Sequence, residues 1–100
     1  MYNHRMAVAS LDPDEVSRRL AALNGWTVQA GKLHRTFTFT DFVAAFGFMT
    51  SVALVAERMN HHPEWHNVYN RVAVDLVTHD AGGITENDFA LAAAMDRLAH

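Results

Sequence analysis

Hydrophobic residues recur along this chain with two different periods, and the first periodic segment predicts a helix. Asp12, Pro13 and Glu15 form a strong helix start, because the first can cap, the second suits the first helical position and the third can complete a capping box. The residues that follow carry one apolar stripe at helical spacing: Val16, Leu20 and Leu23. Asn24 and Gly25 end this helix, since both tolerate the left-handed conformation found at helix ends.

The next segment changes to a period of two, which is typical of strands. Apolar positions alternate over residues 26–30 and again over residues 33–39, on either side of Gly31 and Lys32. Two such runs separated by a short glycine-containing segment predict an antiparallel hairpin with a tight turn.

Residues 40–60 return to helical spacing, with an apolar stripe at intervals of three and four: Phe42, Phe46, Met49, Ala53 and Ala56. Further apolar residues lie outside that stripe: Val43, Phe48, Val52 and Val55. One sheet face cannot cover a helix that is apolar around much of its circumference. The excess apolar surface of this helix predicts either a subunit contact or burial on two sides within the monomer. Pro63 ends the helix, which places His61 and His62 in its final turn or just beyond.

The last part of the chain predicts extended structure followed by a helix. Residues 68–79 alternate in the manner of a strand, interrupted by a candidate turn at Asn70 and Arg71. A reversal there would return His79 to the neighbourhood of His61, whereas an unbroken strand would separate them by tens of ångströms at about 3.3 Å per residue. Thr85 then caps a final helix that has Asp88 as its third residue.

These segments predict a single domain over residues 1–100 with the element order α-β-β-α-β-β-α. That order indicates an α+β fold in which a four-stranded antiparallel sheet packs against helices. A domain of 100 residues buries a modest share of its surface, so self-association is expected.

Composition narrows the classes of function. A formal net charge of −3 and a pI near 6.1 give no basic patch of the kind that nucleic acid binding requires. The absence of cysteine excludes disulfides, thiolate nucleophiles and thiolate metal sites. The first ten residues are too short and too weakly apolar for a signal peptide, and no apolar run approaches the roughly eighteen residues of a membrane span. We therefore expect a cytoplasmic protein that binds neither nucleic acid nor membrane.

The candidate chemistry lies in three of the seven histidines, His61, His62 and His79. Imidazole titrates near neutral pH, so such a cluster indicates either proton transfer or metal binding. A metal site would need a carboxylate, which Glu57 could supply from the same helical face, but the chain has no HExxH or His-x-His pattern. Alternatively, the first two histidines simply favour the negative end of the helix dipole.

Three neighbouring residues are open to two interpretations. Glu57 is either a site residue or a surface carboxylate, and Asp88 is sufficiently explained as a helix-start residue. Trp65 is either a core residue or a platform for a flat ring, because indole offers both area and stacking geometry.

The spacing of these residues resembles the signature of the pterin-4a-carbinolamine dehydratases, known in animals as dimerization cofactors of a homeodomain transcription factor. The matching spaced positions are Glu57, His61, His62, Pro63, Tyr69, His79 and Asp88. Further stretches are similar to the animal members: residues 41–42, 45–50, 52–54, 61–65, 67–70 and 78–79. The resemblance is dense from about residue 40 to residue 91 and thin before residue 25.

The resemblance implies a three-helix, four-stranded α+β fold that assembles as a homodimer or homotetramer. It also implies dehydration of a 4a-hydroxytetrahydropterin, the product of aromatic amino acid hydroxylases, to a quinonoid dihydropterin, without a metal or organic cofactor. Carried over by position, His61, His62 and His79 are the catalytic residues. The substrate-binding residues are Asn60, Val77, Thr78, Asp80, Glu57, Trp65 and Asp88. Such an enzyme has a small-molecule pterin as its substrate and one of the hydroxylases as its partner in the pathway.

The chain departs from the animal members at two positions near these residues. Ala81 stands where they have a cysteine, so no thiol-dependent property is expected. His66 replaces an aromatic residue. A different class of function stays open, a small oligomeric protein-binding module that stabilises a partner's dimer, although pure scaffolding would not require the three histidines.

Overall fold

The computed structural model describes residues 8–99 and confirms the predicted α+β class and element order. The first seven residues, including His4, and the terminal His100 lie outside the described range. The elements are α1 (Pro13–Leu20), β1 (Thr27–Gln29), β2 (Lys32–Thr38), α2 (Phe42–Met59), β3 (Glu64–Val68), β4 (Arg71–Leu76), the 3-10 turn η1 (His79–Ala81) and α3 (Glu86–Leu98).

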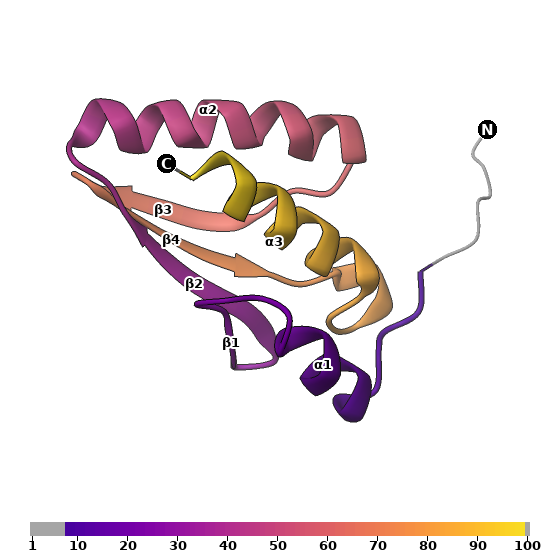
Figure 1. Cartoon of the computed structure of the whole chain (residues 1–100). Coiled ribbons are helices and arrows are strands. Elements are labelled where there is room, and N and C mark those ends of the chain that lie inside the picture. The colour runs from indigo at the N-terminus through magenta and orange to yellow at the C-terminus, as the bar shows by residue number, and fades with distance from the viewer. Residues whose placement is uncertain (1–7, 100) are drawn as a thin grey trace.

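The four strands form one antiparallel sheet in the order β1-β2-β4-β3. Helices α2 and α3 lie over one face of this sheet, and α1 lies beside its β1 end (Figure 1). Strand residues that point toward the helices form the centre of the core: Leu33, Phe37, Val72, Val74 and Leu76. Within the described residues no helix covers the opposite face, where the alternate strand residues are exposed or half-buried.

Both predicted hairpins are present, each with its turn one residue earlier than predicted. The first strand of the second hairpin, β3, lies almost wholly before the predicted extended segment of residues 68–79, and His79 at the end of that segment begins η1 instead. Ala30 and Gly31 form the first turn with φ values of 53° and 77°, the left-handed pair that a tight hairpin turn requires. In the second hairpin Val68 pairs with Arg71, so the reversal occurs at Tyr69 and Asn70. The predicted return of the chain toward His61 is therefore confirmed.

The first helix is shorter than predicted, whereas the last one begins as predicted. Helix α1 ends at Leu20, and a turn carries the chain to Gly25, which has a φ of 87°. Helix α3 has Thr85 as its N-cap and Asp88 at its third position, in a complete capping box.

The predicted apolar stripe of α2 is buried only in part, at Ala56 and, partly, at Met49. The buried residues are Ala45, Phe48, Val52 and Ala56, whereas Phe42 and Phe46 are half exposed, at 49% and 53%. Because the helix is apolar nearly all round, its periodicity could not define which face meets the sheet. The two alanines bring the helix close to the sheet, and the larger phenylalanines at 42 and 46 are left outside.

Helix α2 also corrects the expectation that no apolar segment approaches the length of a membrane span. Its 18 residues have a mean hydropathy of 1.4, long and apolar enough to cross a membrane by length and composition alone. A core helix of a globular protein can pass the same test. Packing of Val52 and its neighbours against the sheet explains the apolar residues on that side.

Candidate functional site

The end of α2 directs two adjacent histidines into different surroundings. Asn60 terminates the helix in the left-handed conformation, with φ 53° and ψ 42°, which asparagine tolerates better than most residues. The next backbone N–H, that of His61, donates to the Ala56 carbonyl at 3.0 Å. The His61 side chain is only 11% exposed, whereas that of His62 is 60% exposed.

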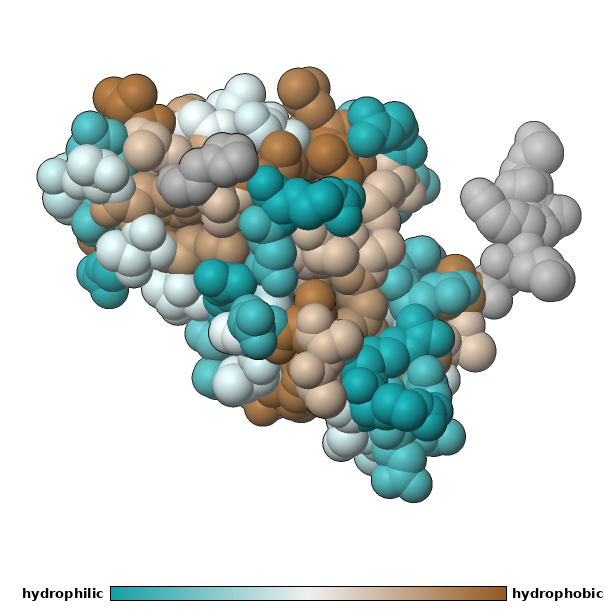
Figure 2. Space-filling view, viewed as in Figure 1, coloured by the Kyte–Doolittle hydropathy of each residue, from teal (hydrophilic) through white to brown (hydrophobic). Residues whose placement is uncertain are grey.

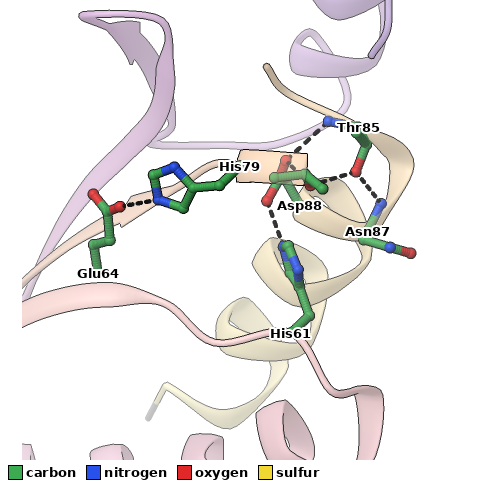
Figure 3. Close-up of polar contacts among 7 residues, drawn as sticks. His61, Glu64, His79, Thr85, Asn87 and Asp88 are labelled. Carbon is green, nitrogen blue, oxygen red and sulfur yellow. Dashed lines mark hydrogen bonds and ion pairs between the residues drawn. The ribbon is translucent and has the colours of Figure 1, made fainter. Parts of the chain in front are cut away.

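His61 points at a carboxylate that is completely buried. Its Nε2 lies 2.6 Å from Oδ1 of Asp88, whose side chain has no exposed surface (Figure 3). The other oxygen of Asp88 accepts hydrogen bonds from the Thr78 hydroxyl and from the Thr85 backbone N–H, both at 2.9 Å. The two threonine hydroxyls are 2.7 Å apart, and that of Thr85 accepts from the Asn87 backbone N–H. Asp88 therefore both starts α3 and anchors His61.

This network defines how His61 carries its protons. An ionised carboxylate can only accept hydrogen bonds, so the Nε2 of His61 must be the donor to Asp88. The Nδ1 is then the ring atom left for chemistry. An imidazole nitrogen in this position can accept a proton when the ring is neutral and donate one when the ring is protonated.

His79 has its own carboxylate partner, supplied from the edge strand. Its Nε2 lies 2.6 Å from Oε2 of Glu64, whose Oε1 is 2.6 Å from Nζ of Lys32 (Figure 3 shows the histidine and the carboxylate). Hydrogen bonds from Lys32 and then from His79 hold the pKa of the Glu64 carboxyl below its ordinary value of 4.5. The bond to Glu64 in turn raises the pKa of Lys32 above 10.5, against partial desolvation.

His62 makes a third, more open pair. Its Nε2 donates to Oε1 of Glu57 at 2.9 Å, and the side chains are 60% and 81% exposed. An ion pair at this exposure holds neither side chain firmly. His62 is thus paired with a carboxylate that is itself largely exposed.

A pocket of about 290 Å³ joins these histidines. It is lined by Asn60, His61, His62, Val77, Thr78, His79 and Asp80. Its size is near the lower end for small-molecule sites. All seven lining residues were predicted as site residues from the sequence.

The three remaining predicted residues do not line the pocket. Glu57 and Asp88 contact it indirectly, each through its histidine. Trp65 packs against the hydrophobic core from β3, which agrees with its interpretation as a core residue. A wall for a flat ring stays a prediction for that side chain.

The carboxylates do not converge in the way that a metal site would require. Within residues 8–99, no group of three or more histidine, aspartate or glutamate side chains is placed to hold an ion. The histidines instead form separate pairs with Asp88, Glu57 and Glu64. The geometry suits proton transfer at individual imidazoles.

Sequence reasoning missed the roles of Glu64, Lys32 and Thr85. Strand alternation could have placed Glu64 on the opposite face from Trp65, but its contact with Lys32 depends on the order of the strands in the sheet. Thr85 was recognised as a helix cap only. Its contact with Thr78 arises because η1 folds back between β4 and α3.

The family model and the similar relatives that we compared point to the same protein family. Residues 9–98 match the family model described as "Pterin 4 alpha carbinolamine dehydratase". A protein of Solibacter usitatus is 61% identical over 89 residues, which cover 89% of this chain and 94% of that protein. One from Rhizobium johnstonii is 52% identical over 96 residues, covering 94% and 95%. Both carry the name "Putative pterin-4-alpha-carbinolamine dehydratase".

Two solved structures share the fold. A Brucella melitensis protein described as a transcriptional coactivator/pterin dehydratase is 46% identical, with a TM-score of 0.88 over 91% of this chain and 99% of that one. A pterin dehydratase-like protein described as a RuBisCO assembly factor in the alpha-carboxysome is 25% identical, with a TM-score of 0.65 over 76% and 90%.

Proposed function

This chain belongs to the pterin-4a-carbinolamine dehydratase family, and we propose that it dehydrates a 4a-hydroxytetrahydropterin to the quinonoid dihydropterin by histidine acid/base catalysis. In doing so it recycles the pterin cofactor of an aromatic amino acid hydroxylase. The observation that carries the proposal is the pocket that combines His61, His62 and His79, with His61 backed by the buried carboxylate of Asp88.

The reaction needs two proton transfers at neighbouring atoms of the substrate. The bond from carbon 4a to its hydroxyl breaks, and an acid protonates the departing oxygen so that it leaves as water. The adjacent ring nitrogen loses its proton to a base, and its electron pair forms the new double bond to carbon 4a. Imidazole is the side chain best suited to exchange protons near neutral pH, so two histidines fit these two roles.

His61 and His79 are the residues that we propose for the two transfers. Each has a carboxylate on Nε2, from Asp88 and Glu64 respectively, so each has Nδ1 left to exchange a proton with the substrate. His62 lines the same pocket, and its side chain pairs with the exposed carboxylate of Glu57. It is suited to positioning the substrate and to assisting proton transfer.

The remaining lining residues are proposed to bind the edge of the pterin ring. Asn60 and Asp80 are exposed and offer an amide and a carboxylate to the ring, and Val77 offers an apolar contact beside them. Thr78 differs, because its hydroxyl already donates to Asp88 and its backbone N–H to Gly83. We assign Thr78 chiefly to holding the carboxylate behind His61.

The test is kinetic. The 4a-carbinolamine is generated with an aromatic amino acid hydroxylase, and formation of the quinonoid product is followed with and without this protein. Because the carbinolamine also dehydrates spontaneously, that background rate is subtracted. Acceleration above background is expected, and its absence at micromolar protein would exclude the dehydratase function.

We also propose that the protein is a homodimer or homotetramer assembled through the exposed side of α2. That side carries apolar residues which nothing in the described monomer covers: Phe42, Val43, Phe46 and Leu54. A groove of about 440 Å³ opens there, and along the top of Figure 2 brown, hydrophobic residues stand in separate clusters with paler residues between them. Burial of apolar surface of this kind is a main driving force of association.

The same surface favours one alternative function, a protein-binding module. The coactivator description of the Brucella protein and the assembly-factor description of the RuBisCO-associated protein both concern binding to other proteins. Sedimentation equilibrium distinguishes self-association through the exposed side of α2 from binding of a different protein there. A stable homo-oligomer that covers this face would leave it unavailable to a different partner, whereas a monomer would favour the module.

A further inference from the structure

The contact between His79 and Glu64 is one part of a chain of three side chains across the sheet. Lys32 comes from the first residue of β2 and Glu64 from the first residue of β3, and the strand between them is β4. The two oxygens of Glu64 are divided between its neighbours, one at 2.6 Å from the lysine Nζ and one at 2.6 Å from the Nε2 of His79. Glu64 therefore links the sheet to a residue of the pocket.

We infer that Glu64 is a positioning residue for His79, and that Lys32 holds the Glu64 carboxylate in the orientation this requires. The inference deepens the proposed dehydratase function and rests on it. Glu64 and Lys32 lie on the solvent-facing side of the sheet and do not line the pocket, so their proposed role is to orient a residue that does.

The need for positioning follows from where His79 lies. It starts a 3-10 turn of three residues, and its side chain is 75% exposed. Within residues 8–99, Glu64 is the only side chain that forms a hydrogen bond with its ring. Without that bond, the imidazole is free to occupy several rotamers, and only some of them present Nδ1 to the substrate.

Lys32 is needed because Glu64 has an acidic neighbour. In the register of β3 and β4, Glu64 lies opposite Asp75, which in turn lies opposite His34 of β2 and accepts a hydrogen bond from its Nδ1 at 2.9 Å. Like charges directly opposite one another in a sheet are unfavourable. The ammonium of Lys32 offsets this repulsion and occupies the Glu64 oxygen that does not face His79.

The experiment compares Glu64→Gln, Lys32→Met and Lys32→Arg with the wild-type protein, using Asp75→Asn as the matched control. Asp75→Asn removes a negative charge from the same face of the sheet without touching His79. An amide at 64 can accept from only one of its two donors, so the chain of contacts is broken. These side chains are exposed enough that folding should persist, which circular dichroism checks.

For Glu64→Gln we expect kcat to fall about tenfold with little change in KM, because an orienting contact rather than a substrate contact is lost. Lys32→Met should lower kcat by less than Glu64→Gln does. Lys32→Arg should keep kcat near the wild-type value, since arginine keeps the positive charge and the hydrogen-bond donors. Asp75→Asn should leave kcat unchanged. Three-bond Hα–Hβ couplings of His79 should report one rotamer in the wild type and rotamer averaging in Glu64→Gln.

The outcomes separate this inference from the proposed function. If the wild-type protein accelerates dehydration and Glu64→Gln has unchanged kcat and unchanged His79 couplings, the positioning role is wrong and the dehydratase function stands. If the wild type shows no acceleration, the function fails, and the couplings alone then decide whether Glu64 orients His79. An equal loss of kcat in Asp75→Asn would show a general charge effect and overturn the inference.

Discussion

Replacing Asp88 by asparagine should abolish most of the activity while the fold persists. The carboxylate is fully buried and accepts from three donors: the Thr78 hydroxyl, the Thr85 N–H and the Nε2–H of His61. The amide oxygen of asparagine can keep the two threonine donors. Its NH₂ group must then face His61 as a donor, so the Nε2 of His61 becomes the acceptor and the proton moves to Nδ1.

The change of tautomer determines the size of the effect on activity. With Nδ1 protonated, a neutral His61 cannot accept a proton at the atom left for the substrate. The same kind of exchange behind the histidine of a serine protease triad costs about 10⁴-fold in kcat. Because the dehydration also proceeds without catalysis and other imidazoles line this pocket, we expect a loss of about 10²- to 10⁴-fold in kcat/KM.

The effect on stability should be moderate. Hydrogen bonds to a charged group contribute about 1 kcal/mol more than those to a neutral one, so three of them amount to about 3 kcal/mol. That loss lowers the midpoint of thermal unfolding by on the order of 10–20 °C in a domain of this size. Asp88→Ala is the wrong choice, because three buried donors without an acceptor would cost about 3–9 kcal/mol, comparable with the whole stability of a domain.

The assay combines three measurements on Asp88→Asn. Dehydration kinetics give kcat/KM, calorimetry gives the unfolding midpoint, and imidazole ¹⁵N shifts give the tautomer of His61. Asp75→Asn is the matched control, since it makes the same substitution beside His34 and outside the pocket. Full activity in Asp88→Asn with the His61 proton on Nδ1 would refute the assignment of Nδ1 as the reacting atom.

Three further predictions follow from the site and from α2. His61→Ala and His79→Ala should each slow turnover by about 10²-fold or more in the carbinolamine assay if they transfer protons; a variant with wild-type turnover is not an acid or base. The pKa of Glu64, followed by carboxyl ¹³C chemical shifts, should lie below 4.5 in the wild type and rise in Lys32→Met. A carboxyl pKa that is lowered in the folded protein stabilises it above pH 4.5, and this stability is lost as the pH falls through the folded-state pKa. Lys32→Met should therefore unfold at a higher pH than the wild type during acid titration. Acid unfolding at the same pH in both proteins would contradict this. Phe46→Asp should dissociate the oligomer in sedimentation equilibrium, whereas Val28→Asp, which places the same charge at another exposed apolar residue, should not; an unchanged mass for Phe46→Asp would move the interface elsewhere.

The element order could be predicted because the hydrophobic period changes clearly at each boundary, from helical to alternating and back. The predicted position of each hairpin turn was one residue too late in the chain. In the first hairpin the left-handed pair begins at Ala30, a residue without the glycine signal that would have marked it. In the second, Tyr69 adopts a positive φ of 51°, which its residue type does not suggest.

The buried face of α2 and the contacts of Glu64 could not be predicted, for two different reasons. Around an all-apolar helix, periodicity carries little information about direction, and the shape of the facing sheet decides which side is buried. The pairing of Glu64 with Lys32 depends on β4 lying between β2 and β3. By contrast, the lining of the pocket by His61 and His79 followed once a reversal near residue 70 was assumed.

The β3 and β4 hairpin also restricts how the chain length between His61 and His79 can change. Neighbouring strand residues face opposite sides of the sheet, so one residue inserted within β4 would turn Leu76 toward solvent and Asp75 toward the core. The number of residues between His61 and His79 can therefore change only in steps of two if every strand residue is to keep facing the same side of the sheet. Length can be added at the turn end, by Tyr69 and Asn70, where an extra residue in each arm extends the hairpin by about 3.3 Å and leaves the pocket end undisturbed.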